Sequence, residues 1–172
     1  MLTVAIIGAG PLGRWLARTA ACAGYRVLLE DVMPSNLHHA QEEIRAQLNA
    51  ATLASVCFVR TLEDAAQPAD LVIDCVPDEL ESKLEILWLL DRMAPPRALF
   101  LTPTMHLALA DLAACTYRPE KVMTVNASPL AFVESMGPQI ALRATQATAP
   151  ETIVEIENFW KKLGFAPQTG IE

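Results

Sequence analysis

The sequence predicts an α/β domain whose mostly parallel sheet is covered by helices on both faces. Short apolar runs rich in branched residues recur along the chain, and such runs are typical of strands buried on both sides. They alternate with segments whose apolar residues recur at spacings of three and four, the pattern of one helical face. The 172 residues, of which 52% are apolar and 19% charged, are enough for one domain with a well-filled core.

The expected elements follow this alternation along the chain. Pro11 suits the first turn of a helix, since its missing N–H would have no partner there, and Gly24 suits the position after the helix end. The expected strands are Leu2–Ile7, Val27–Leu29, Val56–Val59, Leu71–Cys75, Ala98–Leu101 and Val122–Val125. The expected helices are Pro11–Ala23, Pro34–Ala51, Asp78–Met93, Leu107–Cys115 and Glu151–Leu163. The stretch Phe132–Arg143 stays open between loop and strand, and Phe165–Thr169 is at most a last strand.

Composition excludes several classes of protein. Twenty acidic against thirteen basic residues give a net charge of −7, which argues against a nucleic-acid binder. No apolar run reaches the roughly eighteen residues of a membrane span, and no basic region precedes the first strand as in a signal peptide. The four cysteines form no CxxC pair, which argues against a zinc site or a disulfide framework. We therefore expect a soluble, reduced, cytoplasmic domain.

The segment Gly8–Gly13, here called the glycine turn, carries the strongest functional signal. It reads GAGPLG and lies directly between the first strand and the first helix, the context in which a GxGxxG motif is informative. Gly8 allows the tight turn, Gly10 lets the backbone approach a diphosphate, and Gly13 lets the helix pack closely on the strand. The helix N-terminus then faces the phosphates. This predicts a Rossmann-type doubly wound fold whose expected cofactor contacts include Gly8, Gly10, Pro11, Leu12 and Gly13.

Asp31 supplies the acid that this motif requires after the second strand. It lies 18 residues after Gly13, close to the usual spacing of about twenty. A carboxylate at this position accepts hydrogen bonds from ribose hydroxyls and repels a 2′-phosphate, so we expect NAD rather than NADP. The alternative is a tight turn that binds no ligand.

Pro77, Pro103 and Pro129 each follow an expected strand, and strand ends line the ligand crevice of an open parallel sheet. Prolines also mark loops in any protein, which is the alternative. Val76, Pro77 and Thr102 are included among the expected cofactor contacts.

The chain resembles the NAD-binding domain of the L-3-hydroxyacyl-CoA dehydrogenase family over nearly its whole length. The resemblance rests on IIGAGPLG, VLLED, ADLVIDCVPDELESK, FLTPTMHLALADLA and RPEKVMTV. By this resemblance Asp74 and Asp78 match two acids of the family and Lys83 matches its lysine. The resemblance places Asp78 and Lys83 near the nicotinamide half of NAD. A solvated acid–base pair at a helix start is the alternative interpretation.

The catalytic positions of the family are changed in this sequence. Met105 occupies the position of a serine that contacts the substrate oxygen, and Val125–Pro129 matches the segment of the catalytic histidine without containing a histidine. Glu134 matches the orienting glutamate across a short deletion. His106 lies directly beside the serine position, and we take His106 with Glu134 as a displaced base and its acid. A local hydrogen bond at the start of a short helix is the alternative for His106.

Three functions follow as hypotheses. One is an NAD-dependent oxidoreductase that exchanges hydride with C3 of a hydroxyacyl-CoA, and another is a non-catalytic NAD(H)-binding or regulatory module acting through a partner. A degenerate structural domain is the third, which the retained glycines and Asp31 disfavour.

Family members continue into a helical domain that closes the substrate site and forms the dimer, and we expect residues 1–172 to hold the NAD-binding domain alone. The sequence leaves open whether this is a stand-alone domain or one cut at the domain border. We expect a homodimer or a partner chain on the side that the helical domain covers.

Overall fold

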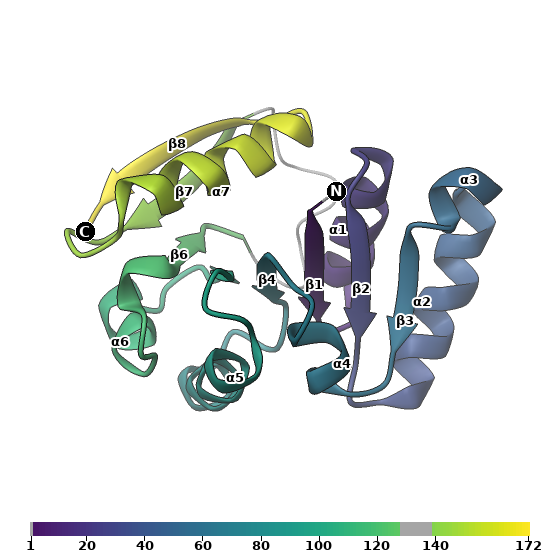
Figure 1. Ribbon diagram of the computed structural model, residues 1–172, viewed down its shortest axis with the longest axis horizontal. Helices are drawn as coiled ribbons and strands as arrows, with labels where there is room; N and C mark the ends of the chain where they lie inside the picture. Colours follow the sequence, from purple (N-terminus) through teal and green to yellow (C-terminus); the bar gives the residue numbers. More distant parts are fainter. Residues whose placement is uncertain (1, 128–138) are drawn as a thin grey trace.

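The computed structural model describes residues 2–127 and 139–172, which form one eight-stranded sheet in the order β3-β2-β1-β4-β5-β6-β7-β8 (Figure 1). Neighbouring strands from β3 to β6 are parallel, β7 is antiparallel to β6, and β8 is parallel to β7. This confirms the mostly parallel sheet. The strands are β1 (Thr3–Ile7), β2 (Arg26–Glu30), β3 (Val56–Val59), β4 (Leu71–Asp74), β5 (Leu99–Pro103), β6 (Val122–Val125), β7 (Gln139–Ala144) and β8 (Ala166–Ile171).

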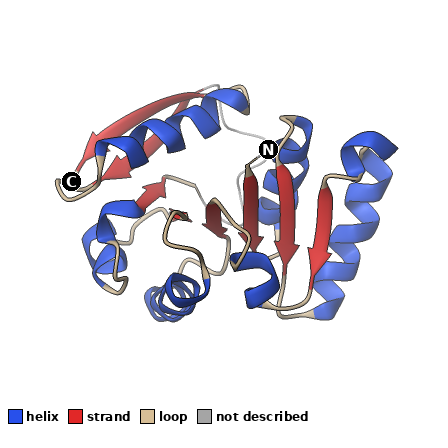
Figure 2. Cartoon of the chain, viewed as in Figure 1, coloured by secondary structure: helices blue, strands red, loops and turns tan. Residues whose placement is uncertain are grey.

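Helices cover both faces of the sheet, as Figure 2 shows. The helices are α1 (Pro11–Cys22), α2 (Pro34–Gln47), α3 (Ala50–Leu53), α4 (Leu62–Ala66), α5 (Leu80–Met93), α6 (Leu109–Ala114) and α7 (Pro150–Lys162), with a 3-10 turn at Pro119–Lys121. Helices α1, α2 and α7 contribute to the core on one face, and α4, α5 and α6 to the core on the other. Within the described residues, none of the helices has the length and apolar character needed to span a bilayer.

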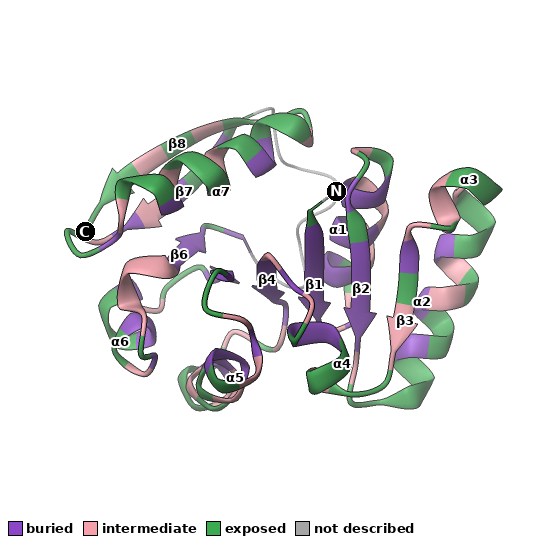
Figure 3. Cartoon of the chain, viewed as in Figure 1, coloured by how far each residue is buried: buried purple, intermediate pink, exposed green. Residues whose placement is uncertain are grey.

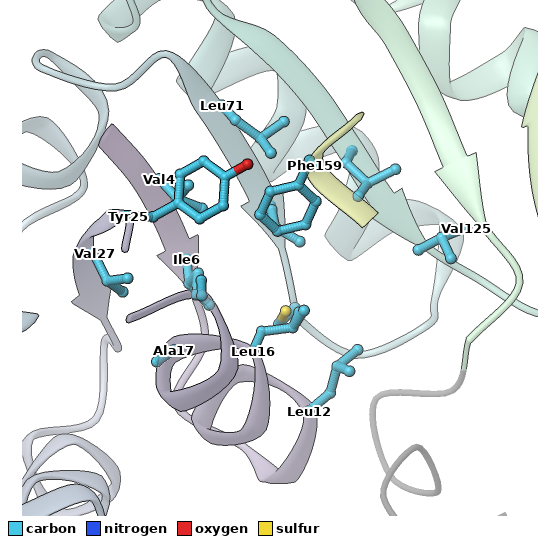
Figure 4. Close-up of a cluster of buried hydrophobic side chains, with 14 of the residues drawn as sticks. Val4, Ile6, Leu12, Leu16, Ala17, Tyr25, Val27, Leu71, Val125 and Phe159 are labelled. Atoms are coloured by element: carbon cyan, nitrogen blue, oxygen red, sulfur yellow. The ribbon is translucent and has the colours of Figure 1, made fainter. Parts of the chain in front are cut away.

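Two hydrophobic cores result from the alternation of side chains along the strands. In β1, Val4 and Ile6 belong to the core beneath α1, whereas Ala5 and Ile7 belong to the core beneath α4 and α5. Every residue of β1 is buried (Figure 3), which explains why its sequence is continuously apolar from Val4 to Ile7 after the buried Thr3. The first core also holds Val125 of β6 (Figure 4). The sheet thereby separates two layers of helices and presents its carboxyl edge as the place for a site.

Polar side chains set several helix boundaries that differ from the expectation. The single helix expected over residues 34–51 is interrupted at Leu48, which is extended, and Asn49 restarts the chain as α3 by accepting the Thr52 N–H at 2.9 Å. Helix α4 was not expected from periodicity; the hydroxyl of Thr61 caps it by accepting the Asp64 N–H at 3.1 Å.

Helices α5 and α6 also begin later in the sequence than expected, and the residues that remain in the preceding loops help to form the site. Helix α5 begins at Leu80 rather than Asp78, which leaves Asp78 in the loop. Helix α6 begins at Leu109 because the Thr104 hydroxyl accepts the Leu107 N–H at 3.1 Å and holds the chain in a turn.

The end of the chain adds two strands to the sheet. The ambiguous stretch 132–143 contains most of β7, and the rest of that stretch lies outside the described residues. Strand β8 pairs with β7 along its whole length from Ala166 to Ile171, two residues further than the expected strand. Helix α7 connects the two strands and covers one face of them, with Trp160 fully buried.

Candidate functional site

A cleft of about 900 Å³ lies at the carboxyl ends of β1, β2 and β4 and is called the cofactor cleft here. Its walls come from the glycine turn, the end of β2, the loop between β4 and α5, and one side of α5. Met105 and His106, which follow β5, complete the opposite end. Strand ends of an open parallel sheet are where ligands bind in this architecture.

The structure explains the presence of glycine at the three positions of the glycine turn in three different ways. Gly8 has a φ of +104°, and a Cβ there would lie 2.9 Å from the carbonyl oxygen of Cys75. A Cβ at Gly13 would lie 1.8 Å from the carbonyl oxygen of Gly8, so only glycine lets α1 approach β1 this closely. Gly10 differs, because a Cβ there meets nothing within 4 Å. The open space at Gly10, which lines the cofactor cleft, is therefore available to a ligand rather than to the protein.

Asp31 is fixed to the glycine turn by its own hydrogen bonds. Its Oδ2 accepts the N–H of Ala9 at 2.7 Å, and its Oδ1 accepts the N–H of Met33 at 2.8 Å. The side-chain amide of Asn36 donates to the same carboxylate at 3.3 Å. A carboxylate has about four acceptor positions, so these bonds orient Asp31 while leaving capacity for ligand hydroxyls in the cleft.

Glu30 is a cleft residue that the sequence analysis did not include. Only 4% of Glu30 is exposed, although it is acidic and lines the cofactor cleft. Burial, and then the neighbouring charge of Asp31, raises the pKa of Glu30 from 4.5 to about 7. The available signal was an acid in the last position of an otherwise apolar buried strand, Val27-Leu28-Leu29-Glu30.

Asp78 and His106 meet at the other end of the cleft. Asp78 Oδ2 accepts the backbone N–H of Met105 at 2.9 Å and lies 3.5 Å from Nε2 of His106. The Asp78 side chain is 13% exposed and the His106 side chain 70% exposed, so the acid is enclosed and the imidazole is open to the cleft mouth. The other oxygen, Oδ1, is buried without a hydrogen-bond partner among the described residues. This pair can hold or accept a proton.

Lys83 and Asp74 form an ion pair behind the cleft wall. Lys83 is fully buried, and its Nζ lies 3.2 Å from Oδ2 of Asp74 and 3.4 Å from the carbonyl oxygen of Val76. Burial raises the pKa of Asp74, and the charge of Lys83 opposes that shift. Lys83 was expected at the cofactor, but it is not among the residues that line the cleft. Its contacts instead fix the start of the loop that forms the wall.

The other expected residues divide between the cleft and the interior. Val76, Pro77 and Asp78 line the cleft with Gly8, Gly10, Pro11 and Asp31. Thr102 is fully buried in β5, and Leu12 and Gly13 are buried in the first turns of α1. Val125 is buried in the first core (Figure 4). Glu134 lies outside the described residues.

The walls of the cleft are rich in acidic side chains. The carboxylic acid and imidazole side chains that line it are Glu30, Asp31, Asp78, Glu79, Glu85 and His106. No lysine or arginine is among these lining residues. Over the same described part of the chain, no group of three His, Cys, Asp or Glu side chains is arranged to hold a metal ion.

Comparison with known proteins decides which cofactor this geometry serves. A model of the family described as "3-hydroxyacyl-CoA dehydrogenase, NAD binding domain" matches residues 3–168. The chain belongs to this family. This NAD-binding domain includes the glycine turn and Asp31 within the matched residues.

Curated relatives and solved structures agree with this assignment. The NAD-binding domain is 31% identical to the 3-hydroxyadipyl-CoA dehydrogenase of Escherichia coli K12, over 93% of this chain and 36% of that protein. It is 26% identical to a probable 3-hydroxybutyryl-CoA dehydrogenase of Bacillus subtilis, over 94% of this chain and 59% of that protein. A solved 3-hydroxybutyryl-CoA dehydrogenase of E. coli K12 superposes with a TM-score of 0.83 at 27% identity, covering 99% of this chain and 38% of that one. The NAD-binding domain spans less than two thirds of each of these proteins.

The residues of the cleft fit NAD. No side chain caps the first turn of α1, and the space over Gly10 lets a diphosphate approach the backbone there. Asp31 offers acceptors for the hydroxyls of the adenosine ribose. The cleft of about 900 Å³ is also lined by Val76, Pro77, Asp78 and His106.

Proposed function

We propose that this NAD-binding domain serves an oxidoreductase that acts on a 3-hydroxyacyl-CoA, with His106 as the residue that takes and returns the hydroxyl proton. The observation that carries the proposal is the continuity of the cofactor cleft. The same cleft is lined by the glycine turn and Asp31 at one end and by Asp78 and His106 at the other. This continuity supports a proton-transfer role for His106 toward a dinucleotide bound along the cleft.

Each residue has a role that its contacts support. When bound, NAD supplies the acceptor for the hydride that leaves C3 of the substrate. His106 Nδ1, the ring nitrogen not paired with Asp78, accepts the proton of the C3 hydroxyl, and the Asp78 carboxylate, 3.5 Å from Nε2, stabilises the resulting imidazolium. The N–H of Met105 holds Asp78 in place. We assign this supporting role to Asp78, with Glu134 as a further candidate acid.

The exposure of His106 also supports the proposal that another part of the protein or a partner shields this end of the cleft from water. A base and substrate that remain open to water lose much of the benefit of fixed charges. We propose that a further domain or a partner chain, such as a second copy in a homodimer, covers Met105 and His106 and completes an acyl-CoA site.

The test is reduction of acetoacetyl-CoA by NADH, measured beside NADH binding. We expect His106→Asn to lower kcat by about 100-fold or more, the usual contribution of a general base, and to change the Kd of NADH by less than about twofold. His38→Asn is a matched control, because the His38 side chain is 71% exposed and lies 3.4 Å from the carboxylate of Glu42. An equal rate in the His106 variant and wild type would remove His106 from the proposal.

A non-catalytic NAD(H)-binding module is the second candidate. The observation that favours it is that apolar residues stand at the family's serine and histidine positions. Val125 is buried in the first core, and the side chain of Met105 offers no hydrogen-bond donor. Tight NADH binding without turnover of acetoacetyl-CoA, both alone and with an added partner chain, would select this function over the enzyme.

A further inference from the structure

We propose that Glu30 is a specificity residue of the cofactor cleft, whose carboxylate accepts a hydrogen bond from the amino group of the adenine of NAD. The inference concerns cofactor binding by this family member and does not depend on the proposed catalysis. Asp31 is the acid that the glycine-turn motif calls for, and the motif assigns nothing to the residue before it.

Glu30 is buried without a partner in the protein. Its backbone carbonyl accepts the N–H of Gly8 at 2.8 Å, which fixes its position beside the glycine turn. Among residues 2–127 and 139–172, no hydrogen bond or ion pair reaches its carboxyl group, although only 4% of the residue is exposed. Burying a carboxyl group without a donor is unfavourable. The same burial is the main cause of the raised pKa of Glu30. A ligand in the cleft can supply the missing donor.

The direction of the Glu30 side chain follows from the pleat of β2. Leu28 belongs to the core beneath α4 and α5, and Glu30, two residues later, projects on the same face. On that face the cleft is lined by Leu62 of α4 and by Ile86 and Leu89 of α5. This part of the cleft combines apolar walls with one carboxyl group.

Adenine is the part of NAD that matches such surroundings. The ribose bound by Asp31 carries the adenine directly, so the base lies within reach of the residue next to Asp31. Its flat ring suits the apolar walls, and its exocyclic amine is a hydrogen-bond donor at the ring edge. The phosphates do not match, because a carboxylate repels them, and the nicotinamide lies at the opposite end of the cleft with Asp78 and His106.

The test compares NADH with reduced nicotinamide hypoxanthine dinucleotide, in which a carbonyl replaces the amine. We expect wild type to bind NADH about tenfold more tightly or better, the usual value of a hydrogen bond to a charged group. In Glu30→Leu the ratio of the two Kd values should fall to about one, mainly through weaker NADH binding. Glu30→Gln can donate to the carbonyl, so it should shift the preference toward the hypoxanthine dinucleotide.

The control is Glu63→Gln, which removes an exposed acid of α4 that bonds to Gln67 and does not line the cleft. It should keep the wild-type ratio. A wild-type ratio near one, or a ratio in Glu30→Leu and Glu30→Gln equal to that of wild type, would overturn the inference. Thermal unfolding of each variant shows that it is folded when its Kd is measured. This test measures only dinucleotide binding and does not use the acetoacetyl-CoA assay. A failure of the proposed enzymatic activity and a failure of this inference can therefore be told apart.

Discussion

The Oδ2 atom of Asp31 lies 2.7 Å from the backbone nitrogen of Ala9, which donates a hydrogen bond to it. Asp31, which we expect to bind the ribose, and the glycine turn, which we expect to bind the diphosphate, are therefore one connected unit. A substitution at Asp31 changes both the charge offered to the cofactor and the support of the glycine turn.

Removing the Asp31 carboxylate should weaken NADH binding by about tenfold or more, since hydrogen bonds to a charged acceptor are lost. Asp31→Ala should also lower the free energy of unfolding, because the N–H groups of Ala9 and Met33 lose their acceptor. Asp31→Asn keeps an acceptor but no charge, so it should bind NADPH better relative to NADH than wild type does. Fluorescence titration with both nucleotides measures this. Tighter binding of NADPH than NADH by wild type would contradict the role of Asp31.

Gly10→Ala and Gly13→Ala should separate ligand binding from folding. The methyl group at position 13 would overlap the Gly8 carbonyl oxygen at 1.8 Å, and we expect a loss of several kcal/mol of stability or failure to fold. The methyl group at position 10 meets nothing, so stability should change by less than about 1 kcal/mol while NADH binding weakens. Urea unfolding and NADH titration of both variants provide the comparison. Full NADH affinity in Gly10→Ala would show that the diphosphate does not approach this position.

Lys83→Met should be strongly destabilising, by about 3–5 kcal/mol, because it leaves Asp74 buried without its counter-charge. The double variant Lys83→Met/Asp74→Asn should recover part of this loss. Lys161→Met, which breaks the exposed pair with Glu157, should cost less than about 1 kcal/mol. Equal losses from the buried and the exposed pair in urea unfolding would contradict the interior role of Lys83.

Glu30 should make the protein less stable as the pH rises. Below pH 4.5 the carboxyl group is protonated in both states, whereas between 4.5 and about 7 the unfolded chain releases its proton first and unfolding becomes easier. The difference between 4.5 and about 7 corresponds to roughly 3 kcal/mol. Glu30→Gln should therefore be more stable than wild type at pH 8, and this advantage should disappear near pH 4.5. A constant difference in urea unfolding across this range would show that Glu30 does not titrate as described.

Local sequence signals determined most of the fold. The strands and long helices are visible as apolar periodicities, and the glycine turn was readable because its context is contiguous. Helix α4 was missed because five residues are too few for a periodic pattern. The break before α3 depends on the capping side chain of Asn49, which competes with a continuous apolar face.

The site was less predictable because it is assembled from distant segments. Asp78 and His106 lie 28 positions apart on separate loops, and no spacing rule connects them. Lys83 was expected at the cofactor from resemblance alone, but the turn of α5 directs it inward to Asp74. Glu30 was overlooked because the neighbouring Asp31 satisfied the motif, although an acid at the end of an apolar strand was a visible signal.

The acidic lining of the cofactor cleft has a consequence for its response to salt. NAD carries a negatively charged diphosphate, yet the lining includes five acidic side chains and no lysine or arginine. Attraction for the diphosphate must then come from backbone dipoles at the start of α1, which act only at short range. Dissolved ions screen the longer-range repulsion between the carboxylates and the dinucleotide. Raising the ionic strength should therefore preserve or strengthen NADH affinity, the opposite of what a site built on basic side chains would show.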